Sequence, residues 1–314
     1  MARAVIGVDL GGTNLRTALL GPEGILFDKK KEDSHAAGGY EQVIRKLVDS
    51  INRQRKNAEQ RGLAVAAVGV GAPGVIHAHR GIVVKSPNFP DWNNLPLKEE
   101  LERPLGIPVF VENDANAAAL GEQWLGAAKG INSMILLTLG TGVGGGIVLD
   151  GRIWQGADGM AGEVGHMTIF PEGRQCGCGN RGCLEMYASS RGIVLTYQER
   201  LAETGAASAG LTSEQIYERA RSGDTVACDV MSRMGRSLGI GIANLINIFN
   251  PEMIVIGGGV KDAWQLFIAA AREEIAKRAF AFPAERAQIV PSALGDDAGM
   301  IGAAAIALQR TAQA

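Results

Sequence analysis

Short apolar runs that end on glycine or on polar residues alternate with longer amphipathic segments along the sequence. Runs of this kind are typical of buried strands followed by tight turns. In residues 41–61 the apolar positions recur every three or four residues opposite a charged face, which predicts a helix. By the same criteria we predict strands with their turns at residues 4–10, 15–21, 65–74, 107–114, 133–151 and 253–260, and further helices at 115–125, 226–249 and 299–309.

Two of these regions share one design, in which an apolar strand, a glycine corner and a returning strand follow one another. Residues 4–20 and 133–151 both have this order, and we predict that each belongs to one lobe of an α/β protein. We place the border near Asp114, which gives a small first lobe over 1–113 and a large second lobe over 114–297. The length of 314 residues, the 43 glycines and the 46% of apolar residues fit two such lobes.

The charge distribution excludes several kinds of partner. The formal net charge is −2 and acidic and basic residues are interspersed, whereas nucleic acids and anionic membranes require clustered Lys and Arg. No apolar run reaches the ~18 residues of a membrane-spanning helix, and the first residues pass into a strand instead of a signal peptide. We therefore expect a cytoplasmic protein that keeps its cysteines reduced and binds neither nucleic acid nor membrane.

Glycine-rich turns follow three of the predicted strands and suit phosphate binding. In residues 9–14 (DLGGTN) glycine lets a phosphate approach the backbone amides, and Asp9 suits Mg²⁺ because a bare carboxylate would repel phosphate. Thr141 adds a hydroxyl to the turn 139–146 (LGTGVGGG), which does not fit the GxxxxGK[ST] pattern, and the third turn is 257–259. Together the turns suit the phosphates and adenosine of a nucleotide. Unrelated glycine turns, the first with a capping Asp, are the alternative.

The most specific metal signal is the spacing H-x9-C-x-C-x4-C of His166, Cys176, Cys178 and Cys183. One imidazole and three thiolates match a closed tetrahedral Zn²⁺ site, which is structural because no coordination position stays open for water. A disulfide or free thiols are the alternatives. The remaining cysteine, Cys228, lies in an apolar helix pattern, which predicts a small buried side chain.

Several polar side chains adjoin these motifs. Glu163 and Glu185 flank the metal loop, where each carboxylate can accept hydrogen bonds from two adjacent hydroxyls of a polyhydroxylated ligand; two surface acids are the alternative. Asp114 ends a strand at the predicted border, where it can accept the proton of an attacking alcohol, although such a residue also suits a helix N-cap. The segment 86–96 carries Trp92 and either closes over a sugar or forms a long connection.

The motifs DLGGTN, GAPG, VENDANAAALGE, LGTGVGGG, GEVGH, CGCGNRGCLE and IGGG occur in this order between Gly7 and about Gly302. In this combination the sequence resembles the ROK family of sugar kinases, most closely its ATP-dependent bacterial glucokinases. The resemblance implies a two-lobed actin- and hexokinase-like (ribonuclease H-like) fold with a cleft between the lobes. It also implies a homodimer or homotetramer, and a C-terminal helix, about 298–314, that joins the first lobe.

The resemblance also implies roles for single residues. Asp114 matches the general base that takes the proton from the sugar 6-hydroxyl, and His166 would bind Zn²⁺ through one ring nitrogen and sugar through the other. The other sugar-contacting positions are Asn88, Asn113, Glu163 and Glu185. The nucleotide positions, beside Asp9, are Gly11, Gly12, Thr13, Asn14, Gly140, Thr141, Gly142, Gly258 and Gly259.

The expected reaction is therefore phosphorylation of glucose to glucose 6-phosphate, with ATP, Mg²⁺ and a structural Zn²⁺. N-acetylhexosamine and mannose kinases are the main alternatives, because the pocket around residues 86–96 decides the choice at C2 of the sugar; a fructokinase fits the complete cysteine loop less well. A sugar-responsive regulator is the non-enzymatic alternative, but we expect no DNA-binding domain before the strand that begins by Ala4. Whether polyphosphate replaces ATP stays open.

Overall fold

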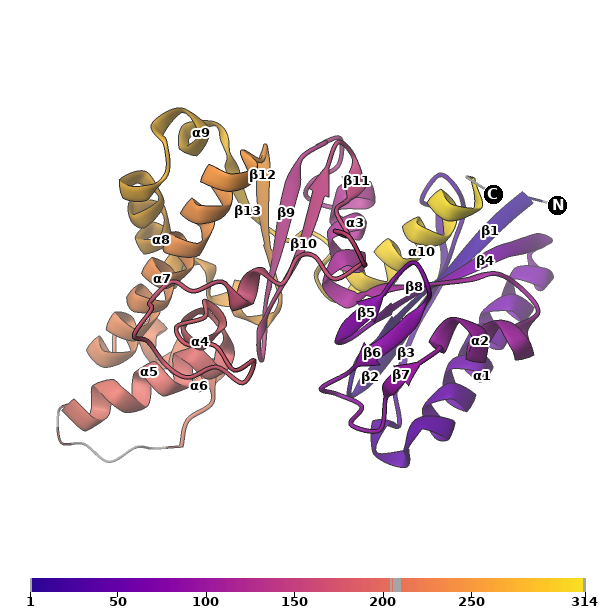
Figure 1. Cartoon of the computed structure of the whole chain (residues 1–314), viewed down its shortest axis with the longest axis horizontal. Helices are drawn as coiled ribbons and strands as arrows, with labels where there is room; N and C mark the ends of the chain where they lie inside the picture. The colour runs from indigo at the N-terminus through magenta and orange to yellow at the C-terminus, as the bar shows by residue number, and fades with distance from the viewer. Residues whose placement is uncertain (1, 204, 206–209, 313–314) are drawn as a thin grey trace. The chain divides into compact units, whose positions relative to one another are not determined.

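The computed structural model describes residues 2–203, 205 and 210–312. Its contacts divide the chain into two compact units, whose elements are labelled in Figure 1. The first unit comprises Met1–Asn132, Gly146–Gly162 and Ala293–Ala314, and the second comprises Ser133–Gly145 and Glu163–Ser292. In the described part of the chain, none of the helices combines the length and the hydropathy that crossing a membrane requires.

The first unit is built on a five-stranded sheet with the order β3 (Leu26–Asp33), β2 (Asn14–Leu20), β1 (Ala2–Leu10), β4 (Leu63–Ala72) and β8 (Val109–Asn113). The predicted N-terminal hairpin is confirmed, because β1 and β2 pair antiparallel with Asp9 opposite Arg16. Strand β4 pairs parallel with β1, and β8 pairs parallel with β4. A smaller antiparallel sheet contains β5 (Val75–His77), β6 (Ile82–Lys85) and β7 (Asn93–Leu95).

The two faces of the larger sheet bury different helices, because successive side chains of a strand point to opposite faces. On one face Ile6 and Val8 join a core with α1 (Tyr40–Gln60) and α2 (Leu97–Leu105). On the other face Val5 and Ala67 pack with α10 (Ala298–Thr311), drawn in yellow in Figure 1. Helix α3 (Asp114–Leu125) packs against α10 in the same unit. The C-terminal helix therefore returns to the N-terminal strands, as the resemblance implies.

Two glycines let α10 lie directly on the sheet. A Cβ at Gly7 would lie 1.9 Å from the carbonyl oxygen of Met300, and a Cβ at Gly69 would lie 1.8 Å from that of Ala303. Any larger residue would push the helix away from the sheet. The close approach brings the first turn of α10 to the end of β1, where a Cβ at Gly299 would lie 2.7 Å from the carboxyl carbon of Asp9.

A second five-stranded sheet has the order β11 (Arg152–Ile153), β10 (Val143–Leu149), β9 (Met134–Leu139), β12 (Met253–Gly257) and β13 (Gln288–Pro291). Strands β9, β12 and β13 pair parallel in the second unit. The long helix α7 packs against α8, where Gly235 and Gly239 admit the backbone of Phe267 and Ala271. The helices of this unit are α4 (Glu185–Ala188), α5 (Ser190–Glu203), α6 (Ser213–Arg221), α7 (Thr225–Phe249), α8 (Trp264–Arg278) and α9 (Ala281–Arg286).

Short 3-10 helices complete both units and place several site residues. The first unit contains η1 (Ala36–Gly38) and η4 (Gly295–Asp297), which leads into α10. The second unit contains η2 (Val164–His166) and η3 (Gly259–Ala263), which follows β12. His166 therefore ends a tight helical turn, and Gly259 begins one.

The border between the observed units differs from the border that the sequence predicted at Asp114. Residues 114–132 and 146–162 belong to the first unit. The reason is the packing of α3 on α10, where a Cβ at Gly302 would lie 1.6 Å from the carbonyl oxygen of Ala117. The predicted border followed the end of β8 and did not account for this contact. The assignment of the units to the lobes of a kinase stays a prediction.

Candidate active site

Neighbouring parallel strands of the first unit end at one edge of its sheet. The register places Asp9 on β1 opposite Gly71 on β4, and Gly71 opposite Glu112 on β8. Since neighbouring strands lie about 4.8 Å apart, the backbones of Asp9 and Glu112 are about 10 Å apart. Ligands of open α/β sheets bind outside such carboxyl ends. Asp9, the predicted Mg²⁺ ligand, and Asp114, the predicted base, therefore belong to the same edge of the sheet.

Asp9 is half-buried and lies beside a guanidinium group. The distance from Arg16 Nη1 to Asp9 Oδ2 is 3.4 Å, and Arg16 Nη2 lies 2.6 Å from Asp296 Oδ2. Burial raises the pKa of Asp9 to about 6, although Arg16 acts in the opposite direction. A divalent cation beside the carboxylate would favour its charged form. This environment fits the predicted role of Asp9.

The first glycine turn lies against Asn88. The N–H of Gly11 donates to the carbonyl of Asn14 at 2.8 Å, which closes the turn. A Cβ at Gly12 would lie 2.6 Å from Asn88 Nδ2, so any larger residue would displace this amide. Thr13 and Asn88 are both exposed. A predicted sugar-contacting residue thus lies beside the predicted phosphate turn.

Asn113, not Asp114, is the N-cap of α3. Its Oδ1 accepts hydrogen bonds from the backbone N–H groups of Ala115 and Asn116, and its Nδ2 donates to the carbonyl of Gly74 at 3.0 Å. Asp114 is the first residue of the helix and is half-buried, and its Oδ1 accepts from the N–H of Ala115 at 2.8 Å. The N-cap alternative for Asp114 is therefore wrong, because the preceding amide takes that role.

In the second unit, the other two glycine turns are neighbours. Strands β9 and β12 pair parallel with Thr138 opposite Gly257, so the turns that follow them start at the same edge. A Cβ at Gly258 would lie 2.2 Å from the carbonyl oxygen of Leu139, and the φ of Gly258, +80°, also favours glycine. The turn that contains Gly140 and the turn that contains Gly258 therefore lie side by side.

Glu185 connects this edge to the cysteine loop. It is the first residue of α4 and is half-buried. Its Oε2 accepts a hydrogen bond from the N–H of Val143, and its Oε1 lies 3.9 Å from Cys176 Sγ. A Cβ at Gly142 would lie 2.4 Å from the same Oε2. One carboxylate therefore contacts both the second glycine turn and the predicted metal loop.

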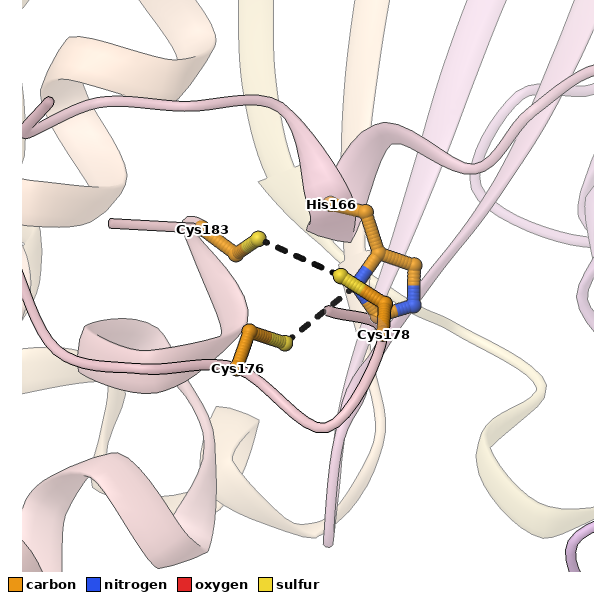
Figure 2. A group of neighbouring side chains, drawn as sticks. All are labelled: His166, Cys176, Cys178 and Cys183. Atoms are coloured by element: carbon orange, nitrogen blue, oxygen red, sulfur yellow. Dashed lines mark hydrogen bonds between the residues drawn. The ribbon is translucent and has the colours of Figure 1, made fainter. Parts of the chain in front are cut away.

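Figure 2 shows the side chains of His166, Cys176, Cys178 and Cys183 gathered around one point. Their ligand atoms all lie within 4.8 Å of one another. The Cys176 Sγ to His166 Nδ1 distance and the Cys178 Sγ to Cys183 Sγ distance are both 3.7 Å. Sulfurs bound to one zinc at about 2.3 Å in tetrahedral geometry lie about 3.8 Å apart, whereas a disulfide bond is about 2.05 Å long. The cluster therefore fits a zinc ion, and the disulfide alternative is wrong.

The surroundings of the thiols also suit a cation. Burial raises the pKa of Cys183 to about 12 and raises that of Cys176 as well, so both stay protonated unless a cation replaces the proton. Cys178 is exposed. Asn180 Nδ2 donates to Thr168 Oγ1 at 2.8 Å and lies 3.5 Å from Cys183 Sγ, so it orients this sulfur from outside the cluster.

The two ring nitrogens of His166 face different groups. Nδ1 faces Cys176 inside the cluster, while Nε2 lies 3.9 Å from Oε2 of Glu163. Glu163 is exposed and His166 is half-buried. The ring can therefore hold a metal on one side and share a hydroxylated ligand with Glu163 on the other, as the resemblance implies.

The predicted site residues form two groups, one in each unit. The group of the first unit consists of Asp9, Gly11, Gly12, Thr13, Asn14, Asn88, Asn113 and Asp114. The group of the second unit consists of Gly140, Thr141, Gly142, Glu163, His166, Cys176, Cys178, Cys183, Glu185, Gly258 and Gly259. That both groups act on the same substrates stays a prediction.

Two other side chains differ from the predictions. Trp92 is 1% exposed and stacks on Phe89 with ring centroids 4.4 Å apart, in the core of the first unit. Trp92 therefore anchors the segment 86–96 in the core and does not present its indole to a ligand, while closure of the segment over a sugar stays a prediction. Cys228 is exposed, because it lies between the buried positions of α7.

Sequence reasoning missed two charged residues that support the site. Arg16 is the partner of Asp9, and the hairpin offered a signal, because Arg16 follows the turn at the distance that places it opposite Asp9. Glu112 is 1% exposed although it is acidic, and it directly precedes Asn113. The apolar run around Glu112 predicted a buried strand, but the local sequence does not indicate which residues would donate hydrogen bonds to a buried carboxylate.

Comparisons with known proteins agree with this geometry. The ROK family model matches residues 5–310. A glucokinase from Thermotoga maritima is 39% identical over 98% of both chains, and a xylose repressor from Caldicellulosiruptor bescii is 34% identical over 97% of this chain and 78% of its own. A ROK family glucokinase from Streptomyces griseus, solved in complex with glucose and AMPPNP, is 37% identical over 98% of this chain and 99% of its own, with a TM-score of 0.79.

These similarities extend over nearly the whole sequence and include the fold as well as the residues. The predicted α/β fold of actin- and hexokinase-like sugar kinases is confirmed. The glycine turns, the Asn-Asp pair at the start of α3 and the histidine–cysteine cluster are all part of the matched region. The chain therefore belongs to the ROK family.

Proposed function

We propose that this protein is an ATP-dependent kinase that phosphorylates glucose at its 6-hydroxyl. The observation that carries the proposal is the shared sheet edge of Asp9 and Asp114: the backbones of Asp9 and of Glu112, two residues before Asp114, are about 10 Å apart, which leaves room for a metal-bound phosphate next to a base. The glucokinase from Thermotoga maritima and the Streptomyces griseus structure with glucose and AMPPNP support the choice of both substrates.

The residues of the first unit would perform the transfer. Asp114 accepts the proton of the 6-hydroxyl while the sugar oxygen forms a bond to the γ-phosphorus, and the bond from that phosphorus to the β-phosphate oxygen breaks. Asp9 would hold Mg²⁺, directly or through water, and the bound ion would supply positive charge next to the phosphates. Backbone amides of the turn 11–14 other than that of Gly11, which closes the turn, would hold phosphate oxygens, and Asn88 and Asn113 would orient the sugar.

The residues of the second unit would hold both substrates in register. Glu163, His166 Nε2 and Glu185 accept or donate hydrogen bonds to the sugar hydroxyls. His166 Nδ1 and the three thiolates would hold Zn²⁺, which would make the loop rigid and take no part in the chemistry, because four protein ligands fill the site. The turns at 140–142 and 258–259 bind the nucleotide. The rate enhancement comes from positioning and from charge stabilisation.

An ADP-release assay tests the proposal. Glucose, mannose, N-acetylglucosamine, N-acetylmannosamine and fructose are compared with ATP and Mg²⁺, and we expect the highest kcat/KM for glucose. Asp114→Asn should lower kcat by about 10²–10⁴-fold while glucose still binds, because only the proton acceptor is lost. A variant with wild-type kcat would remove Asp114 from this role.

The relationship to the xylose repressor favours one second candidate, a sugar-responsive regulator. A regulator would bind a sugar without releasing ADP. Binding of glucose by calorimetry, with no turnover of any sugar in the assay, would support this candidate and refute the kinase. Turnover of mannose or of an N-acetylhexosamine in preference to glucose would instead change the proposed sugar and leave the reaction class unchanged.

We also propose a homodimer or a homotetramer, which sedimentation equilibrium can distinguish from a monomer. A cytoplasmic location agrees with three reduced thiols in the metal loop, because oxidising compartments favour disulfides.

A further inference from the structure

A buried carboxylate, Glu112, lies two residues before the proposed base Asp114 and has no part in the proposed reaction. Glu112 is the penultimate residue of β8 and is 1% exposed. Its Oε1 accepts hydrogen bonds from Asn116 Nδ2 at 2.9 Å and from the N–H of Asn113 at 3.0 Å. Its Oε2 accepts one from Gln155 Nε2. A buried carboxylate is costly unless donors surround it, and Glu112 has donors on both oxygens.

The donors to Glu112 come from separate parts of the first unit, and two of them flank Asp114 in sequence. Asn113 and Asn116 lie on either side of Asp114 in sequence, so Glu112 holds both ends of the turn that carries the base. Gln155 follows β11, and its Oε1 accepts from Arg310 Nη2 on α10 at 3.3 Å. Burial raises the pKa of Glu112, while its three donors and the charge of Arg310 act in the opposite direction.

We propose that Glu112 is a positioning residue that holds the Asp114 carboxylate in its reactive orientation, with Gln155 as its partner. The inference rests on the proposed function, because it takes Asp114 as the base. Glu112 touches neither substrate in this role. It acts through the backbone of Asn113 and the side chain of Asn116, which together fix the first turn of α3. A small displacement of a catalytic group is sufficient to lower kcat strongly.

The contact between Glu112 and Gln155 allows a test in which the acceptor and the donor are exchanged between the two residues. In Glu112→Gln, Oε1 can still accept from Asn113 and Asn116, but an NH₂ group then faces the NH₂ group of Gln155. If Gln155 turned its amide over, its NH₂ group would face Arg310. In Gln155→Glu two carboxylates face each other. The double variant E112Q/Q155E restores a donor and an acceptor at this contact and keeps an acceptor beside Arg310.

Steady-state ADP release with glucose is measured for the wild type, for the two single variants and for the double variant. We expect each single variant to lower kcat by about 10- to 100-fold with less than about a two-fold change in the KM for glucose, and the double variant to regain most of the lost kcat. Glu122→Gln is the matched control, since Glu122 is a fully buried carboxylate on α3, the helix that carries Asp114, and its oxygens accept from the backbone N–H groups of Ala127, Ala293 and Leu294. Its melting temperature should fall while its kcat stays unchanged.

The outcomes separate this inference from the proposed function. Wild-type protein that phosphorylates no sugar refutes the proposed function, and the inference falls with it. Wild-type protein that is active, together with an E112Q variant of unchanged kcat, refutes the inference alone. A loss in E112Q that E122Q matches, or that the double variant does not reverse, shows a general effect on stability and also overturns the inference.

Discussion

The carboxylate of Glu185 accepts a hydrogen bond from the backbone N–H of Val143 at 3.0 Å, which joins α4 to the second glycine turn. Val143 directly follows Gly142, and the other oxygen of Glu185 lies 3.9 Å from the sulfur of Cys176. The same side chain is a predicted sugar contact. The turn proposed for ATP and the loop proposed for zinc and sugar are therefore connected through one residue.

Glu185→Gln should impair the use of both substrates. The glutamine side chain has one oxygen and one NH₂ group in place of two oxygens. It would present the NH₂ group either to the N–H of Val143 or to the cysteine loop, so one of the two contacts is lost. A hydrogen bond to a charged group contributes about 1.5–3 kcal/mol, so we expect the KM for glucose and the KM for ATP each to rise by about ten-fold or more. Glu172→Gln, at an exposed position of the same loop, should leave both values unchanged. An effect on the glucose KM alone would contradict the connection.

Cys178→Ser should release the metal and weaken sugar binding. Loss of one thiolate from a four-ligand zinc site lowers the affinity for zinc, and the loop then loses the constraint that holds His166. We expect about one zinc per chain in the wild-type protein by mass spectrometry, much less in the variant, a lower melting temperature and a higher KM for glucose.

Cys228→Ser is the matched control for the zinc experiment, because Cys228 is exposed on α7 and lies outside the cluster. Its zinc content and KM should equal those of the wild type. Full activity of a zinc-free C178S protein would show that the cluster does not support the sugar site.

Arg16→Gln should weaken the use of ATP and Mg²⁺ more than the use of glucose. The side chains of Arg16 and Asp9 are only 16% and 17% exposed, so the variant leaves a largely buried carboxylate without its neighbouring cation. We expect a loss of about 1–3 kcal/mol in unfolding free energy and a higher KM for Mg-ATP.

Lys29→Gln provides the comparison for the Arg16 variant. Lys29 pairs with Asp297, next to the Asp296 partner of Arg16, but 52% of its side chain is exposed. Exposed ion pairs contribute about 0–1 kcal/mol, so stability and the KM for Mg-ATP should change little. Equal effects of the two variants would show that the general charge of this region matters, and not the contact with Asp9.

Glu32→Gln should destabilise the first unit in a pH-dependent way. Burial alone would raise the pKa of Glu32, but hydrogen bonds from Lys46, Ser50 and Arg53 lower it from 4.5 to about 2. A carboxyl group whose pKa is lower in the folded state stabilises the protein at pH values above its ordinary pKa. This stabilisation is lost as the pH falls toward the pKa of the folded state. We expect the variant to lose about 1–3 kcal/mol at pH 7, and the difference to shrink between pH 4.5 and 2.

Thermal unfolding of wild type, Glu32→Gln and Glu59→Gln at several pH values measures this effect. Glu59 is exposed on α1, so its variant should match the wild type throughout. A difference between Glu32→Gln and wild type that stays constant from pH 7 to pH 3 would refute the ionic origin of the effect.

The strands and helices that lead to the site follow from local patterns. The N-terminal hairpin, the long helix α1 and the strand that ends on Asn113 were predicted within a few residues of their observed bounds. The cysteine cluster was predicted as well, because ligand type and spacing restrict what a short loop can hold. These features depend on residues that are close in sequence.

Features that the sequence did not reveal depend on contacts between distant segments. Trp92 stacks on Phe89 and enters a core that α1 and α2 complete, so an aromatic residue in a polar loop became a packing residue. The observed units are not divided at Asp114, because α3 packs on α10, which lies at the other end of the sequence.

The sequence by itself determined the alternation of strands and helices, the glycine turns and the set of candidate zinc ligands, since period, backbone freedom and donor type are local properties. Only the tertiary structure decided that Asp296 lies beside Arg16, that Asn113 caps α3, and that Glu112 contacts Gln155. The physical reason is that a buried charge must find its partners wherever the packed helices and strands bring them, and the linear spacing of residues does not encode that distance.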